Sequence, residues 1–210
     1  MSSTLIPSRK MTAFIVLTLV AASALVFGPA TLAETASETY VVDKGHSALL
    51  FKIKHLGVSY THGRFNDFSG HFIVDDENLK NAKIELDIDA SSIDSNDQKR
   101  DDHLRSKDYF NVEKHPSISF VSTGITMPEK GVYRVTGNFT LLGVTKEVTF
   151  RMKKIGEGAD PWGGYRIGYE GQLVIKRSEY GMTAMLKGIG DNVYITLGVE
   201  GIRKQAKAEK

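Results

Sequence analysis

The stretch LLFKIKH, residues 49–55, decides the fold class because apolar side chains alternate with lysines along most of it. In an extended chain one face would carry Leu49, Phe51, Ile53 and His55. The opposite face would carry Leu50, Lys52 and Lys54. A period of two with lysines on one side is typical of a β-strand with one apolar and one wet face.

The same alternation recurs along most of the chain and predicts eight strands. Seven further stretches share it: 59–74, 83–89, 117–123, 132–140, 144–152, 165–175 and 193–199. Their wet faces favour antiparallel pairing. Since an open sheet of eight long strands would leave two adhesive edges, we expect closure. The prediction is an all-β fold, an eight-stranded up-and-down antiparallel barrel.

One segment, residues 95–109, reads as a helical excursion from the barrel. Ser95 is followed by Gln98 at the spacing of a capping box. Leu104 is its only strongly apolar residue before Tyr109. A helix this polar is not stable by itself, so we expect it to lie against the barrel.

The first 33 residues read as an export signal with cleavage near Ala33. Arg9 and Lys10 precede an uncharged run over 11–27. An uncleaved membrane anchor is the alternative. Arg9 and Lys10 also account for the whole formal charge of +2, so residues 34–210 are neutral overall. We expect a periplasmic protein with one domain over 34–202 and a charged tail over 203–210.

Several classes of chemistry find no support in the sequence. Neutrality gives no reason to expect nucleic acid as a partner. No cysteine is present, and the six histidines match no metal-binding spacing, so we expect no metal site. Asp101, Asp102 and His103 could be imagined as a base and its orienting group, but adjacent helical residues point in different directions. We therefore do not expect an enzyme.

Inward-facing apolar residues would line the inside of an eight-stranded barrel, whose lumen is either just filled or able to hold one small ligand. Alternation leaves hollow and filled interiors equally open. The residues that we expect to line a ligand pocket are Leu49, Phe51, Ile53, Phe65, Phe68, Phe72, Leu86, Ile88, Phe120, Phe139, Phe150, Met152, Ile167, Tyr169, Leu173 and Ile195.

Four blocks of sequence resemble the YceI-like family of bacterial periplasmic polyisoprenoid-binding proteins. They are GHSALLFKIKHLGVSYTHGRFNDFSGHF (45–72), DDHLRSKDYFNVEKHPSISF (101–120), GNFTLLGVTKEVTF (137–150) and LVIKRSEYGM (173–182). The resemblance covers about residues 40–202. Two departures bear on ligand contacts: Tyr109-Phe110 stands where Phe-Phe is common, and Glu179-Tyr180 where Asp-Phe is frequent.

The resemblance implies a lipocalin-like barrel that binds a long-chain isoprenoid amphiphile, either a polyprenyl phosphate or pyrophosphate or an isoprenoid quinone. The implied role is that of an extracytoplasmic carrier or reservoir, with no cofactor other than this lipid. Candidates for the head group are His55, His103, Arg105 and Arg177. Transient membrane contact and a homodimer are compatible with the sequence. The alternatives are an enzyme that acts on a small amphiphile through a histidine at the mouth, and a filled barrel that works through surface contacts.

Overall fold

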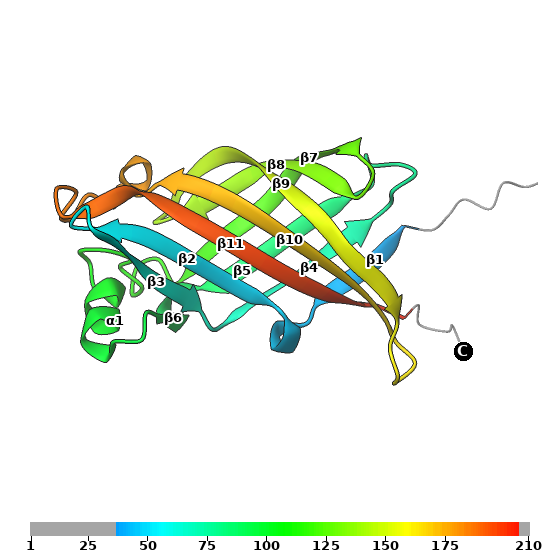
Figure 1. The fold of residues 1–210 in the computed structure, drawn as a ribbon, viewed down its shortest axis with the longest axis horizontal. Coiled ribbons are helices and arrows are strands. Elements are labelled where there is room, and N and C mark those ends of the chain that lie inside the picture. Colours follow the sequence, from blue (N-terminus) through cyan, green and yellow to red (C-terminus); the bar gives the residue numbers. More distant parts are fainter. Residues whose placement is uncertain (1–36, 206–210) are drawn as a thin grey trace, which may run out of the picture. The chain divides into compact units, whose positions relative to one another are not determined.

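The computed structural model describes residues 37–205, which form one β-barrel (Figure 1). The predicted export signal, 1–33, lies outside the described residues. Within 37–205, no helix has the length and apolar composition needed to cross a membrane.

Eleven strands join in one antiparallel sheet, which closes because β1 pairs with both β4 and β11. The strands are β1 (Glu38–Val42), β2 (Ala48–His55), β3 (Ser59–Phe65), β4 (Phe68–Val74), β5 (Lys83–Asp89), β6 (Ile93–Asp94), β7 (Ser117–Glu129), β8 (Val132–Leu141), β9 (Val144–Ala159), β10 (Tyr165–Lys176) and β11 (Ile189–Arg203).

Around the barrel these segments form eight long strands, because three of the eight are each broken in two. β1 and β2 pair with successive parts of β11 and are separated by the 3-10 turn η1 (Lys44–His46). β3 and β4 are separated by residues 66–67, and β5 and β6 by the 3-10 turn η2 (Ala90–Ser92). Each long strand is antiparallel to the next along the chain, so the predicted eight-stranded up-and-down barrel is confirmed.

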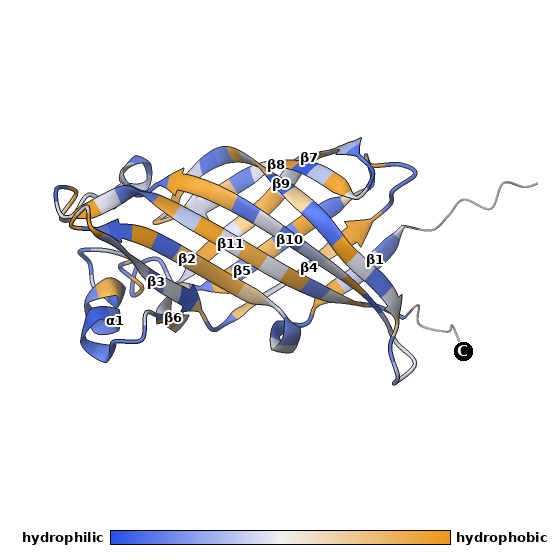
Figure 2. Ribbon diagram, viewed as in Figure 1, coloured by the Kyte–Doolittle hydropathy of each residue, from blue (hydrophilic) through white to orange (hydrophobic). Residues whose placement is uncertain are grey.

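The alternation that predicted the strands also places their side chains. In Figure 2 hydrophobic and hydrophilic residues alternate along the strands. On β8 the odd-numbered residues from Tyr133 to Leu141 are buried and the even-numbered ones face out. The inward side chains form one apolar core inside the barrel. The sheet thus encloses its own core, and no second layer is needed.

The one α-helix of the described residues, α1 (Gln98–Arg105), lies beside the end of the barrel near β3 and β6 (Figure 1). The predicted range, 95–109, was too long, and the predicted cap was wrong. Asp97, not Ser95, is the N-cap, since its carboxylate accepts from the backbone N–H of Arg100 at 2.9 Å. The Ser95 hydroxyl instead donates to the buried carboxylate of Asp101, which also accepts from the Ser95 backbone N–H.

Several boundaries also differ from the sequence predictions: β1 was not predicted, and β7 ends at residue 129, not 123. β9 continues as strand through residue 159, beyond its predicted end at residue 152. Arg203 was assigned to a charged tail, but it is the last residue of β11, where it pairs with Tyr40 and binds the carboxylate of Glu38. These extensions arise because a neighbouring strand supplies hydrogen bonds that local composition does not reveal.

Four aromatic side chains fill the end of the barrel remote from α1. Phe72 stacks on Tyr40 with ring centroids 5.5 Å apart and meets Tyr169 edge-on at 5.7 Å. Tyr133 packs on Tyr169, also at 5.7 Å. The Tyr40 hydroxyl donates to Glu38 at 2.6 Å and the Tyr133 hydroxyl to Asp76 at 2.7 Å. Burial and these acceptors raise the pKa of both tyrosines, so the hydroxyls stay protonated as donors.

Candidate ligand cavity

A cavity of about 380 Å³ lies inside the barrel at the end beside α1. Small-molecule sites typically measure about 300–1,000 Å³, so this cavity is large enough for a ligand. Strands β2, β3, β7, β8, β10 and β11 supply its wall, and α1 and residues 182–189 contribute to its rim. Four rim residues are exposed: His55, Arg100, His103 and Met185. The cavity therefore opens at the α1 end.

Thirteen of the twenty predicted site residues line a cavity. Eight line the larger one: Phe51, Ile53, His55, Phe65, His103, Phe139, Arg177 and Ile195. Five line a second cavity of about 50 Å³ toward the other end of the barrel: Phe72, Leu86, Phe150, Met152 and Tyr169.

Six of the residues predicted to line a ligand pocket line neither cavity. They are Leu49, Phe68, Ile88, Phe120, Ile167 and Leu173, all buried in the core. On β7, Phe120 lies between Ile118 of the larger cavity and Ile125 of the smaller. Its ring packs edge-on against Phe150 at 5.4 Å. A layer of packed side chains thus separates the two cavities.

Glycines on neighbouring strands make room for the phenyl rings of the wall. Gly63 is paired with Phe51 across β2 and β3, and a Cβ added at Gly63 would lie 2.3 Å from Cζ of that ring. Gly137 plays the same part for Phe120, whose Cζ would lie 2.5 Å from an added Cβ. The Phe51 ring therefore lies over a glycine in the wall of the larger cavity, and the Phe120 ring lies over a glycine in the layer between the two cavities.

Arg177 is a buried cation in the cavity wall, only 1% exposed. It begins the 3-10 turn η3 (Arg177–Tyr180), and its guanidinium donates to three backbone carbonyls, those of Met182, Ile189 and Gly190, at 2.9–3.0 Å. Burial lowers the pKa of Arg177, while Tyr109 and Asp191 act in the opposite direction. These hydrogen bonds show that the main role of Arg177 is to hold residues 182–190, which contribute to the rim of the cavity.

Arg105 does not line the cavity, in contrast to its prediction as a head-group contact. Its guanidinium donates to the carbonyls of Ser91 and Ile93 and to Asp102, which ties α1 to η2 and β6. Arg100, which the sequence analysis did not select, lies at the rim instead. Its Nε and Nη2 donate to Ser95, and no contact within 37–205 uses its Nη1.

Tyr109 brings a free hydroxyl to the cavity. The residue is 6% exposed and lines the cavity, yet its hydroxyl has no hydrogen bond to any residue of 37–205. In the same range, no fully buried polar side-chain atom lacks a partner. The hydroxyl oxygen must therefore reach open space, and Tyr109 lines the cavity together with Arg177. His103 packs edge-on against the Tyr109 ring at 5.0 Å.

Other lining residues divide into those that alternation could have found and those that it could not. Thr61, Leu141, Ile175 and Val193 continue the inward alternation of strands already identified. Met182, Met185 and Ile189, by contrast, follow η3 or begin β11, where no period of two extends. For the segment after α1, the only sequence signal was the departure from the family pattern at Tyr109-Phe110.

The residues considered for acid–base catalysis do not converge. Asp101 accepts from Ser95, Asp102 accepts from Gln98 and Arg105, and His103 Nε2 lies 3.2 Å from Asp108. Each side chain thus has a different partner. The arrangement links α1 to its surroundings and supplies no shared catalytic site.

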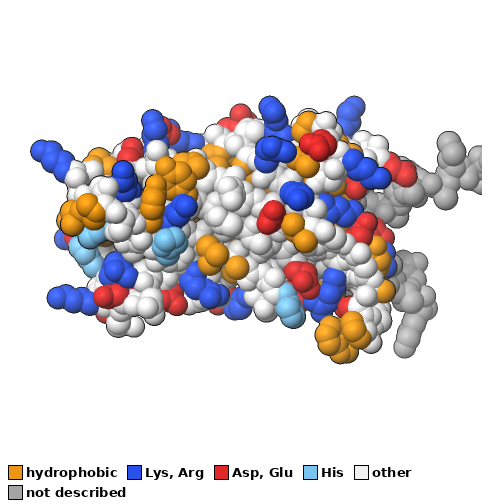
Figure 3. Space-filling model, viewed as in Figure 1, with side chains coloured by type: hydrophobic (Ala, Val, Ile, Leu, Met, Phe, Trp, Pro, Cys, Tyr) orange, Lys and Arg blue, Asp and Glu red, His pale blue; other side chains and the backbone are white. Residues whose placement is uncertain are grey.

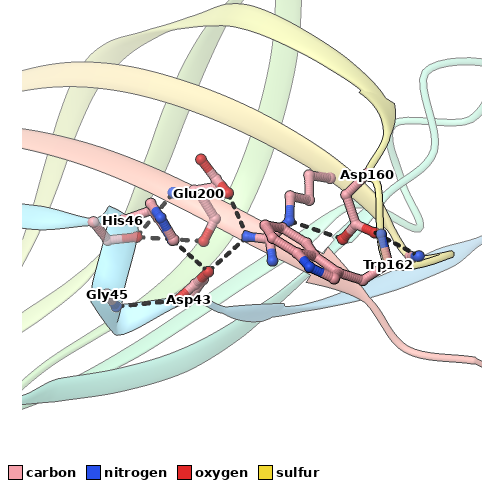
Figure 4. A network of polar contacts seen from close by, with 9 residues as sticks. Asp43, Gly45, His46, Asp160, Trp162 and Glu200 are labelled. Atoms are coloured by element: carbon pink, nitrogen blue, oxygen red, sulfur yellow. Dashed lines mark hydrogen bonds and ion pairs between the residues drawn. The ribbon is translucent and has the colours of Figure 1, made fainter.

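A second polar cluster lies outside the cavity, near η1 (Figure 4). Asp43, His46 and Glu200 offer ligand atoms within 4.8 Å of one another, a spacing compatible with a metal ion. Arg166 Nη1, however, lies 2.6 Å from both carboxylates, and its Nε binds Asp160 at 2.9 Å. Since a guanidinium already joins the carboxylates, we interpret the cluster as an ion-pair network that fixes η1 to β10 and β11.

Comparison with known proteins identifies relatives over almost the whole barrel. Residues 40–201 match the model of the YceI-like domain. A UPF0312 protein of Pseudomonas aeruginosa (strain LESB58) is 43% identical over 186 residues, covering 87% of this chain and 97% of that protein. A UPF0312 protein of Shewanella sp. (strain ANA-3) is 44% identical over 177 residues, covering 83% and 92%.

Solved structures share the same architecture. Burkholderia cenocepacia BcnA superposes with a TM-score of 0.69 at 27% identity, covering 76% of this chain and 98% of that one. The Campylobacter jejuni YCEI protein gives 0.66 at 26%, covering 72% and 90%. A domain of Saccharophagus degradans, described as polyisoprenoid binding, gives 0.61 at 16%, covering 79% and 98%; that likeness concerns the fold alone. The match over 40–201 and the identity to the UPF0312 proteins show that this chain belongs to the YceI-like family.

Proposed function

We propose that the protein binds a long-chain isoprenoid amphiphile, with the tail in the larger cavity and the head group at the rim. The observation that carries this proposal is the apolar cavity of about 380 Å³, which opens at one end beside polar side chains. An apolar wall selects an apolar tail, and a few polar groups at the mouth orient the ligand. The Saccharophagus degradans domain described as polyisoprenoid binding supports the proposal by its shared barrel.

The rim suits an electron-rich head group. Tyr109 offers a hydroxyl without a partner in 37–205, and Arg100 offers Nη1. Within the described residues no carboxylate forms an ion pair with Arg177, although Asp191 is close enough to interact with its charge. A phosphate would gain charge-assisted hydrogen bonds here, and a quinone carbonyl would accept neutral ones. His55 and His103 remain head-group candidates on the same rim.

The role that follows is that of an extracytoplasmic carrier or reservoir, in a protein exported to the periplasm by the signal of residues 1–33. Each buried CH₂ contributes about 0.8 kcal/mol to tail binding relative to water. The competing bilayer is as apolar as the cavity wall, so the net preference for the protein is small. A small preference allows the lipid to be both loaded and delivered.

Mass spectrometry of the protein purified from its own host, under native conditions and after organic extraction, tests this function. We expect a bound prenylated molecule. Ile195 faces the cavity and its neighbour Thr196 faces solvent, which provides a matched pair. Ile195→Trp should remove the bound molecule, whereas Thr196→Trp should retain it. Consistently empty protein, or equal occupancy in the two variants, would contradict the proposal.

The Tyr109→Phe variant tests the head-group contact separately. Since the hydroxyl has no partner in 37–205, its removal should leave the unfolding free energy within about 0.5 kcal/mol of the parent. Loss of one hydrogen bond to a ligand should weaken binding of a short prenyl phosphate or a short-chain quinone, by about 0.5–1.5 kcal/mol if neutral and more if charged. Unchanged affinity for both would remove Tyr109 from the head-group site.

A further inference from the structure

An exposed apolar lip stands at the mouth of the cavity. It consists of Leu56 and Val58 in the β2–β3 turn, and Met185 and Leu186 in the segment between η3 and β11. Their exposed fractions are 62%, 84%, 61% and 41%. The two segments are joined by a hydrogen bond from the Leu56 N–H to the Gly188 carbonyl at 2.7 Å. The two segments of the apolar lip are therefore adjacent, at the left-hand end of the molecule in Figure 3.

The backbone of the apolar lip adopts conformations that its residues do not favour. Leu56 has φ 48° and Met185 has φ 52°, in the left-handed region where glycine or asparagine is preferred. Both side chains are also among the most exposed large apolar ones of the described residues. Backbone strain and exposed apolar surface at the same place favour a contact made in function.

The charge around the apolar lip is positive. Residues 54–60 and 181–190 contain Lys54 and Lys187 and no aspartate or glutamate. Neither lysine forms an ion pair within 37–205. Because residues 34–210 carry no net formal charge, this excess is local. Exposed apolar side chains flanked by free lysines are the combination that binds an anionic lipid surface.

The apolar lip is also continuous with the cavity. Met185 is 61% exposed and at the same time lines the cavity, as does Ile189 four residues later. We propose that the apolar lip docks on an anionic phospholipid bilayer, so that the tail of the ligand passes between bilayer and cavity without crossing water. This rests on the proposed function only for the identity of the cargo, since docking itself needs no ligand.

Flotation with phosphatidylcholine vesicles, with and without phosphatidylglycerol, tests docking on ligand-free protein. We expect the unaltered chain to float with vesicles that contain phosphatidylglycerol. Val58→Glu should weaken this binding by at least about tenfold, because it removes an apolar group and adds a like charge to the surface. Ile155→Glu is the matched control, since Ile155 is 62% exposed on β9 and away from the apolar lip; it should bind as the parent does.

The lysines are tested in the same assay. Each lysine near an anionic surface contributes about a fivefold change in affinity, so the double variant Lys54→Gln, Lys187→Gln should bind the vesicles roughly 25-fold more weakly. Lys130→Gln with Lys153→Gln, outside the apolar lip, should have little effect. A higher salt concentration should likewise weaken vesicle binding by the unaltered chain. Equal flotation of Val58→Glu and the parent would overturn the proposal.

Two further outcomes separate this inference from the proposed function. If a short prenyl phosphate binds in detergent but the vesicles do not bind, docking fails and the function stands. If the vesicles bind but protein from the host is always empty, docking stands and the function fails. Loss of self-association in Val58→Glu, measured by sedimentation, together with unchanged flotation, would assign the apolar lip to a second copy of the chain and overturn docking.

Discussion

One substitution, alanine for glycine, should have different consequences at three positions of the barrel wall. At Gly63 an added Cβ would lie 2.3 Å from Cζ of Phe51, and at Gly201 an added Cβ would lie 2.3 Å from Cζ of Phe72. At Gly198 it would meet nothing within 4 Å. None of the three has a positive φ, so alanine adds no backbone strain. The difference between them is what lies behind the displaced ring.

Behind Phe51 lies the cavity of about 380 Å³, so the ring can turn inward. Overpacking usually lowers the free energy of unfolding by about 1–3 kcal/mol, and we expect the loss in Gly63→Ala to be at or below the lower end of this range. The ring would then occupy space needed by the tail. Displacing two methylene groups of ligand loses about 1.6 kcal/mol, which is more than tenfold in Kd.

Behind Phe72 stand Tyr40 and Tyr169, and only the cavity of about 50 Å³ adjoins them. Gly201→Ala should therefore have the full overpacking cost, about 1–3 kcal/mol, or a fall in Tm of roughly 2–12 °C for a domain of this size. Ligand affinity should be unchanged, because the perturbed ring lies at the other end. Gly198→Ala should leave both stability and affinity near those of the parent.

Denaturant unfolding measures the stability of the three variants, and calorimetric titration with farnesyl pyrophosphate and with a short-chain ubiquinone measures affinity. The expected pattern is loss of affinity with little loss of stability at Gly63, and the reverse at Gly201. If Gly63→Ala were as unstable as Gly201→Ala and bound both ligands as the parent does, the idea that glycine keeps Phe51 in the wall would be refuted.

Three other measurements test the remaining interactions. Arg177→Met leaves three backbone carbonyls without their donor, so the free energy of unfolding should fall by about 3 kcal/mol or more. Arg105→Met should cost less, because its two carbonyl acceptors and Asp102 are nearer solvent. Hydrogen bonds from His46 and Arg166 lower the pKa of Asp43 to about 2, so the free energy of unfolding should fall as the pH is lowered from about 4 toward 2. Denaturant titrations of Asp43→Asn should show a weaker pH dependence. An equally steep fall in the variant would contradict this role of Asp43. Affinity for prenyl phosphates of increasing length should rise until the larger cavity is full and then level off, whereas a continued rise would show that the layer around Phe120 opens.

Alternation was sufficient to predict eight long strands and a closed barrel, but it did not predict β1, the strand that closes the barrel, or the pairing of β1 with the end of β11. Closure is visible in the pairing of Tyr40 with Arg203, which joins the first and last strands of the described chain. The same alternation could not separate Phe51 from Phe120, since both face inward. Phe51 lines the cavity and Phe120 fills the layer below it, and only the surrounding side chains decide this.

Sequence-based prediction was wrong at positions where two residues could have the same structural role. Ser95 and Asp97 are both good N-caps, and Asp97 caps α1 because the buried Asp101 carboxylate takes the hydroxyl and N–H of Ser95. Arg105 and Arg177 both looked like cations at the mouth, yet both donate mainly to backbone carbonyls. Such choices depend on contacts between distant segments, which composition and spacing do not contain.

The proposed function requires a barrel that exchanges a lipid and still discriminates, and the placement of polar groups is compatible with both. The tail contributes little net preference, because the bilayer offers it an equally apolar environment. Aromatic side chains fill the far end of the barrel, where the hydroxyls of Tyr40 and Tyr133 are already bound by carboxylates. Tyr109 and Arg100, which keep unused donors within 37–205, line the larger cavity at the α1 end. Under the proposed function, selection among lipids would therefore fall to the head group, at the same end where the apolar lip would meet the membrane, and recognition and release would take place at a single opening.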